Sequence, residues 1–142
     1  MLTADRLALM SRGRILQQGT PRQCYLQPRS IHAARLLGAV NLLPATVSGG
    51  TATTAFGTLP APGCPDGPAQ AMVRPEGLRL HREDAAAAEA EVMRVRFGGA
   101  FWELKLRMAD CELMIQVAGT PPECGETVAV SLDRERAAIF PG

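Results

Sequence analysis

The chain has 142 residues, enough for one or two small domains, and its 15 Lys and Arg against 14 Asp and Glu leave a net charge of +1. This balance predicts no strong electrostatic attraction to nucleic acid or to an anionic membrane. The apolar runs are far too short to span a bilayer, and the charged start MLTADRLALM lacks the apolar block of a signal peptide. We therefore expect a soluble, cytoplasmic protein.

The first residues predict a β-hairpin. Residues 6–10 and 14–18 contain apolar positions on either side of the turn Ser11-Arg12-Gly13, where Gly13 can adopt a positive φ. A lone two-stranded hairpin is marginal in water. We therefore expect this hairpin to pack against another part of a larger protein or against the segment that follows it.

Two short helices are expected next. Thr20, Pro21 and Gln23 form a helix start, because a Thr cap, a Pro at the first helical position and a Gln three residues after the cap make a capping box. Pro28 ends this helix within two turns. Ser30 caps a second helix, which Gly38 is placed to end in a left-handed conformation.

From residue 39 the pattern changes to short strands. Strands are predicted over 41–47, 51–59, 71–73, 78–80, 101–108, 113–117, 128–132 and 138–140. Residues 58–70, with four prolines, are expected to form a loop, and residues 83–91 a connector with one helical turn. Alternation is clearest at Trp102, Leu104, Leu106 and Met108, and Asp110 is expected in the tight turn that follows. The spacing predicts a mainly β fold, a small antiparallel barrel or sandwich.

The chain carries no signature of catalysis. No P-loop, dinucleotide-binding glycine motif, zinc-protease motif or nucleophile elbow occurs in it. The four cysteines are too far apart for a zinc site or a redox pair, even with His32 and His81 as extra ligands. We predict ordinary reduced thiols, no bound metal and no enzyme activity. The cysteines are Cys24, Cys64, Cys111 and Cys124.

Residues 4–47 resemble the region of ABC importer ATPases that directly follows their switch histidine. That family shows an Ala-Asp-Arg start, a Gly-x-Ile-x-Gln-x-Gly-Thr-Pro run, a Tyr-x-x-Pro, a helix ending in Gly and a strand beginning Asn-x-Leu-Pro. The matching residues are Ala4, Asp5, Arg6, Gly13, Ile15, Gln17, Gly19, Thr20, Pro21, Tyr25, Pro28, Gly38, Asn41, Leu42, Leu43 and Pro44. The remainder is similar to the C-terminal TOBE domain of such ATPases, of the type found in iron, polyamine, sulfate and phosphonate importers.

The resemblance implies two parts. Residues 1–38 would be the tail of an ATPase domain whose ATP and Mg²⁺ sites are not in this sequence, and residues 39–142 an oligonucleotide-binding-like barrel. The barrel would pair with its twin in a homodimer, hold the ATPase subunits together and regulate import. It would lie at the cytoplasmic face of the bacterial inner membrane, next to the permease subunits. Ile31-His32 depart from the Arg-Phe of many relatives.

Other functions remain open in the sequence. Arg74, Glu76, Gly98 and Gly99 are candidate contacts for a partner or a small oxyanion, because glycines allow close backbone approach and Arg74 supplies charge. The simpler interpretation is favoured: the glycines turn the chain, and Arg74 pairs with Glu76 or faces water. Nucleic-acid binding through Phe97 and Phe101 rests on fold analogy alone and is not expected.

Overall fold

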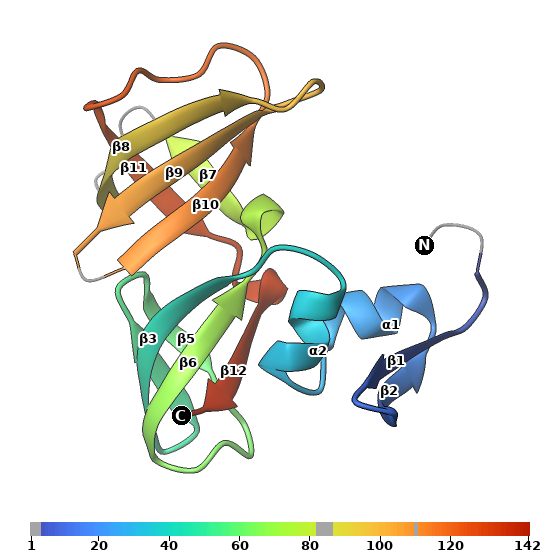
Figure 1. Ribbon diagram of the computed structural model, residues 1–142. Coiled ribbons are helices and arrows are strands. Elements are labelled where there is room, and N and C mark those ends of the chain that lie inside the picture. The colour runs from blue at the N-terminus through green and yellow to red at the C-terminus, as the bar shows by residue number, and fades with distance from the viewer. Residues whose placement is uncertain (1–3, 82–86, 110) are drawn as a thin grey trace. The chain divides into compact units, whose positions relative to one another are not determined.

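The computed structural model describes residues 4–81, 87–109 and 111–142. The chain divides into two compact units, Met1–Val40 and Asn41–Gly142 (Figure 1). The first unit combines a hairpin with two short helices. The second consists of antiparallel strands.

The hairpin of the first unit matches the sequence prediction. Strands β1 (Leu7–Ser11) and β2 (Arg14–Gly19) pair around a two-residue turn. Both turn residues have positive φ, 50° at Arg12 and 76° at Gly13, which is the turn geometry that matches the natural twist of a hairpin.

Helices α1 (Pro21–Leu26) and α2 (Ile31–Leu36) follow. The capping box is confirmed, because Thr20 Oγ1 accepts from Gln23 N at 3.2 Å and Gln23 Oε1 accepts from Thr20 N at 3.0 Å. Ser30 caps α2, and Gly38 has a positive φ of 134°. A small apolar core forms around Leu9, Cys24 and Ala33.

The described residues of the second unit form two five-stranded antiparallel sheets, in the orders β10-β9-β8-β11-β7 and β12-β6-β3-β4-β5. The strands are β3 (Asn41–Ser48), β4 (Thr51–Thr54), β5 (Gly57–Pro60), β6 (Gly67–Val73), β7 (Leu78–His81), β8 (Ala88–Phe97), β9 (Trp102–Met108), β10 (Cys111–Val117), β11 (Thr127–Leu132) and β12 (Ala137–Pro141). The predicted mainly β, antiparallel fold of the oligonucleotide-binding type is confirmed.

The two sheets repeat one topology and exchange their last strands. Each contains a three-stranded meander whose first strand also pairs with a fourth strand, β6 or β11. After β6 the chain crosses through the 3-10 turn η1 (Pro75–Gly77) to β7 of the other sheet, and after β11 it crosses back through η2 (Arg134–Arg136) to β12. The pairings Val73↔Ala137 and Leu78↔Leu132 exchange under one shift of 59 positions, from 73 to 132 and from 78 to 137. The second unit is therefore an internal structural repeat, which the pattern of predicted strands did not reveal.

The two crossovers meet at Gly77. A Cβ atom placed on Gly77 would lie 2.7 Å from Val73 Cγ2 and 3.2 Å from Arg136 Cβ. The backbone N–H of Asp133 donates to the carbonyl of Gly77 at 2.8 Å. Close packing between the two crossovers therefore requires glycine at position 77.

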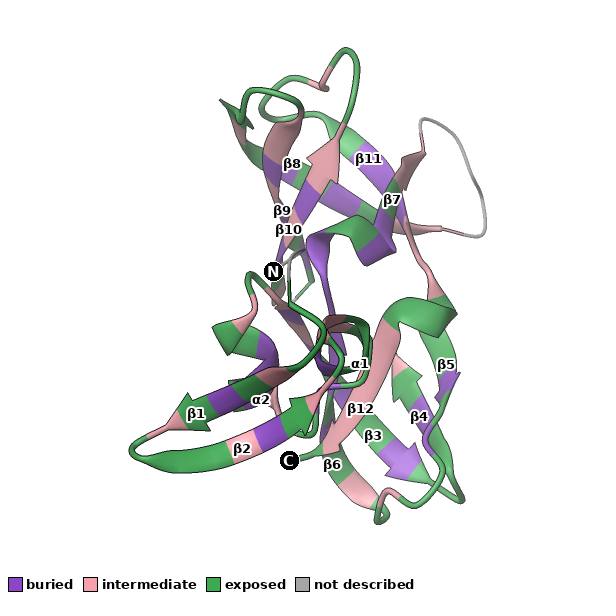
Figure 2. Ribbon diagram, turned by 90° about the vertical axis from the view of Figure 1, so that its right-hand side faces the viewer, coloured by how far each residue is buried: buried purple, intermediate pink, exposed green. Residues whose placement is uncertain are grey.

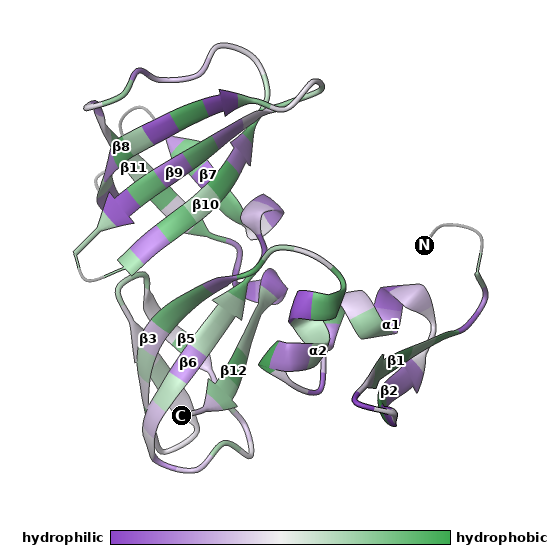
Figure 3. Cartoon of the chain, viewed as in Figure 1, coloured by the Kyte–Doolittle hydropathy of each residue, from purple (hydrophilic) through white to green (hydrophobic). Residues whose placement is uncertain are grey.

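Alternating side chains build one apolar core from both sheets, as the burial and hydropathy patterns show (Figures 2 and 3). Leu104 and Leu106 are fully buried and Met108 is 4% exposed, as predicted, while Trp102 is only half-buried at the end of its strand. Leu43, Val47 and Ala52 contribute from the other sheet. The fold thus depends on small and branched aliphatic side chains rather than on aromatic ones.

Three sequence predictions differ from the structure. The strand predicted over 51–59 is broken at Ala55-Phe56, because Thr54 Oγ1 accepts from Phe56 N and donates to the carbonyl of Gly57, which has a φ of 91°. The loop predicted over 58–70 is shorter, because β5 runs to Pro60 and β6 starts at Gly67. Pro68 is tolerated near the start of its strand.

The connector predicted over 83–91 is a strand from Ala88 onward, since pairing with β11 and β9 outweighs the helix propensity of its alanines. Residues 83–86 of that connector, and Asp110 of the predicted tight turn, lie outside the described residues.

Candidate functional site

Arg74 is a buried cation at the first crossover. It follows the last residue of β6 and precedes η1, and only 4% of its surface is exposed. The expectation that it faces water is therefore wrong. Arg74 takes part in an interaction within the chain, as a buried charge requires, and so does the exposed Glu76.

Gly98 and Gly99 form the turn between β8 and β9. Gly98 N donates to the carbonyl of Phe101 at 2.8 Å, and Gly99 has a φ of 93°. A Cβ atom on Gly98 would lie 2.9 Å from Phe101 Cε2. Both glycines therefore have a structural reason in the turn. They lie in a turn within one sheet, whereas Arg74 lies in the crossover between the two sheets.

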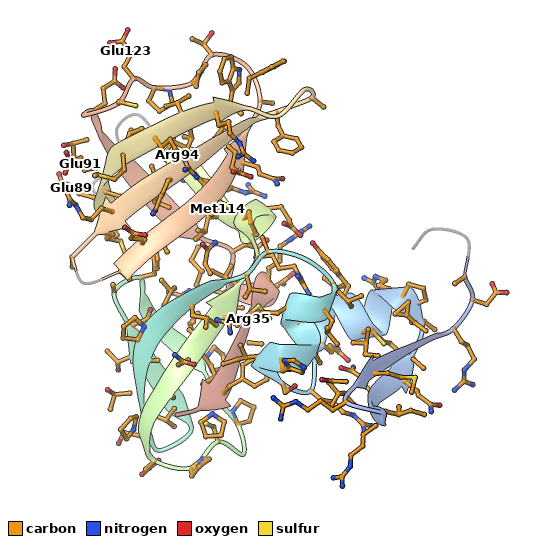
Figure 4. All side chains as sticks on the ribbon, viewed as in Figure 1. Arg35, Glu89, Glu91, Arg94, Met114 and Glu123 are labelled. Carbon is orange, nitrogen blue, oxygen red and sulfur yellow. The ribbon has the colours of Figure 1, made fainter. Side chains whose placement is uncertain are left out.

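Asn41, a residue of the family motif, connects the two sheets. Its Nδ2 donates to the carbonyl of Met114 at 2.8 Å and its Oδ1 accepts from Met114 N at 2.6 Å. Asn41 is 4% exposed, and Met114 lies on β10 (Figure 4). The sequence marked Asn41 as a motif position but gave no signal of this partner 73 residues away.

Gln17 has a similar role in the first unit. Its Nε2 donates to the carbonyl of Gln27 at 3.0 Å, and its Oε1 accepts from Arg29 N at 2.9 Å. The amide thereby fixes the link between α1 and α2, which contains the motif residue Pro28.

The motif residue Gly19 lies close to α1, because a Cβ atom on Gly19 would be 3.0 Å from Gln23 Oε1. The remaining motif residues have local positions: Gly13 in the hairpin turn, Thr20 and Pro21 at the start of α1, Tyr25 within α1, Gly38 after α2 and Pro44 in β3.

On the face formed by β8 and β9, basic side chains pair with acidic ones. Arg96 pairs with Glu103, Lys105 with Glu112 and Arg107 with Glu91, at 3.6, 2.7 and 3.2 Å. Glu89 and Glu91 lie on the same strand as Arg94 (Figure 4). The exposed ring of Phe97 contacts Trp102, with ring centroids 5.0 Å apart. Such a face lacks the basic groove of a single-strand binder.

Metal ligands do not gather in the part of the chain that the structure describes, where no group of three or more His, Cys, Asp or Glu could hold an ion. None of the four cysteines, all of which lie among the described residues, forms a disulfide. Among the described helices, none is long and apolar enough to cross a membrane.

The fold and the motif residues define a repeated β module of the oligonucleotide-binding type. A short unit of one hairpin and two helices precedes this module in the chain. Residues 71–140 match the family model of the TOBE domain. An Fe(3+) ions import ATP-binding protein of Streptomyces avermitilis, FbpC, is 38% identical over 98% of this chain and 41% of its own length. A sulfate/thiosulfate import ATP-binding protein of Chromobacterium violaceum, CysA 2, is 35% identical over 98% of the chain and 42% of its own length.

A solved structure shares the fold. The cytoplasmic molybdate-binding protein ModG, with molybdate bound, aligns with a TM-score of 0.55 and 14% identity over 72% of this chain and 96% of ModG.

Residues 71–140 belong to the TOBE-domain family, and the chain is similar, over nearly its whole length, to the ATP-binding subunits of ABC importers. It spans about two fifths of the length of these relatives, at 41% and 42%.

Proposed function

We propose that this chain is the C-terminal regulatory and dimerisation part of the ATP-binding subunit of an ABC importer. The observation that carries the proposal is that the similarity to such subunits covers 98% of the chain and so includes both units. In this proposal, residues 1–38 complete the ATPase domain and residues 39–142 are the regulatory domain. ATP and Mg²⁺ bind in the part of the relatives that has no counterpart here.

The sheet edges support self-association. Among the described strands, β10 and β7 are the edges of one sheet, and β12 and β5 are the edges of the other. Edge strands present unpaired backbone groups, which a second copy can pair or cover. A homodimer through the barrel domain would hold two ATPase subunits together while they open and close.

The subunit would act at the cytoplasmic face of the inner membrane, where its ATPase part contacts the permease. The chain itself would not hydrolyse ATP, because its sequence contains no P-loop to hold the phosphates.

A chimaera tests this role. The matching part of Streptomyces avermitilis FbpC is replaced by this chain, and ferric ion import is measured in cells that lack their own subunit. We expect the chimaera to support import and FbpC truncated at the same junction to support much less. A folded chimaera that imports no better than the truncated protein would contradict the proposal.

A second candidate function is oxyanion sensing by the TOBE module, for which Arg74 with Glu76 at the first crossover, and Gly98 with Gly99 in the β8–β9 turn, are two separate candidate contacts. The observation that favours it is the fold shared with ModG, a molybdate-binding protein. Calorimetric titration of the chain with molybdate and with sulfate tests it. Saturable heat that Arg74→Lys weakens would support sensing, and a flat titration with both anions would reject it for this chain.

A further inference from the structure

The net charge of +1 conceals a strong asymmetry between the two units. Residues 1–40 contain six arginines and one aspartate, a net charge of +5, and the remaining nine basic and thirteen acidic residues give residues 41–142 a net charge of −4. All six arginines are exposed, and within the described residues none of them forms an ion pair. They are Arg6, Arg12, Arg14, Arg22, Arg29 and Arg35. Clustered, unneutralised cations favour an anionic ligand.

Two of these arginines line a concave site at the hairpin turn. A pocket of about 610 Å³ is lined by Ser11, Arg12, Arg14, Leu16 and His32. Its volume lies in the range of small-molecule sites. All five residues belong to the first unit.

The wall of the pocket is held by a hydrogen bond between elements. His32 Nε2 on α2 and Ser11 Oγ at the end of β1 are 2.9 Å apart. This contact joins the helix to the hairpin, and His32 and Ser11 line the pocket together with Arg12 and Arg14. Leu16 adds an apolar surface against which the aliphatic stems of arginine can pack.

The backbone conformation of Arg12 in the hairpin turn also indicates a functional site. Arg12 has a φ of 50°, where hairpin turns favour Asn, Asp or Gly. Strained non-glycine residues concentrate at functional sites. The geometry of the turn does not explain why an arginine occupies this position. A functional role for the positive charge of Arg12 explains it.

We propose that Ser11, Arg12, Arg14 and His32 bind a phosphate group, carried by a soluble phosphorylated compound or by a lipid headgroup. Guanidinium groups match phosphate oxygens with two parallel hydrogen bonds each, and the hydroxyl and the imidazole supply further polar contacts. This site is separate from the TOBE module and does not depend on the function proposed for it.

The test uses the whole chain and two variants, a control that loses one positive charge outside the pocket and a double variant that loses both arginines of the pocket. Pyrophosphate is titrated calorimetrically at an ionic strength of about 0.15 M, where charges further apart than about 8 Å are screened. We expect the wild type and Arg22→Gln to bind equally, because Arg22 lies on α1 outside the pocket. The double variant Arg12→Gln/Arg14→Gln should bind at least tenfold more weakly.

A second arm identifies the source of the phosphate. The same three proteins are sedimented with vesicles of phosphatidylglycerol and, as a neutral reference, of phosphatidylcholine. Binding to phosphatidylglycerol vesicles but not to pyrophosphate, lost only in the double variant, would assign the site to a lipid headgroup.

Unfolding curves establish that each variant is folded. If the double variant fails to fold, Arg12→Gln and Arg14→Gln are measured singly, and each should weaken binding severalfold. The proposal is overturned if neither arm shows saturable binding, or if Arg22→Gln loses as much affinity as the pocket variants.

Discussion

Asn41 and Met114 are joined by two hydrogen bonds that give one sheet of the second unit a fixed position against the other. The side-chain amide of Asn41 acts like an added strand residue, since it bonds both the N–H and the carbonyl of Met114 on the edge strand β10. A single side chain thus satisfies two backbone groups.

Asn41→Ala should lower the free energy of unfolding by about 1–3 kcal/mol, because it leaves two partly buried backbone groups of Met114 without partners. Gln70→Ala is the control, since Gln70 is exposed on β6 and should change stability by less than about 0.5 kcal/mol. Both are measured by urea unfolding of the whole chain. Equal effects of the two substitutions would refute the role assigned to Asn41.

Gln17→Ala should loosen the first unit selectively. Gln17 is 6% exposed and bonds the carbonyl of Gln27 and the N–H of Arg29. Removing the amide should cost about 1–3 kcal/mol of local stability. Amide hydrogen exchange should therefore speed up in α1 and α2, with little change in residues 41–142. Equal acceleration in both units would mean that they unfold together and that this local account is wrong.

Gly77→Ala should destabilise the second unit by about 1–3 kcal/mol through overpacking. The added Cβ would lie 2.7 Å from Val73 Cγ2. Val73→Ala removes that methyl group, so the double variant Gly77→Ala/Val73→Ala should be more stable than the sum of the two single effects predicts. Strict additivity in thermal unfolding would show that the contact with Val73 does not cause the loss.

Local patterns predicted the fold well where neighbouring residues decide the structure. Thr20, Gln23 and Ser30 cap helices as expected, and Leu104 and Leu106 face the core because strand alternation depends on adjacent positions. Contacts across long sequence separations left no such signal. Neither the exchange of β7 and β12 between the sheets nor the bond from Asn41 to Met114 follows from propensity or spacing.

The candidate sites likewise divide into features that neighbouring residues predict and features that depend on residues far apart in the sequence. Gly98 and Gly99 were predicted either to bind a ligand or to turn the chain, and a turn is what they form. The pocket at Ser11 and His32 was missed, because its residues lie 21 positions apart and meet only when α2 packs beside the hairpin. The net charge of the whole chain also gave no indication that the first unit is strongly basic.

Sedimentation equilibrium of the chain over a range of concentrations is the most direct test of the dimerisation role. The account predicts a mass approaching twice 15.1 kDa as the concentration rises. Arg94→Ala should not change this mass, since Arg94 lies on β8, in the interior of its sheet rather than on an edge. A mass that stays at 15.1 kDa up to the highest concentration would contradict a dimer formed through the TOBE module.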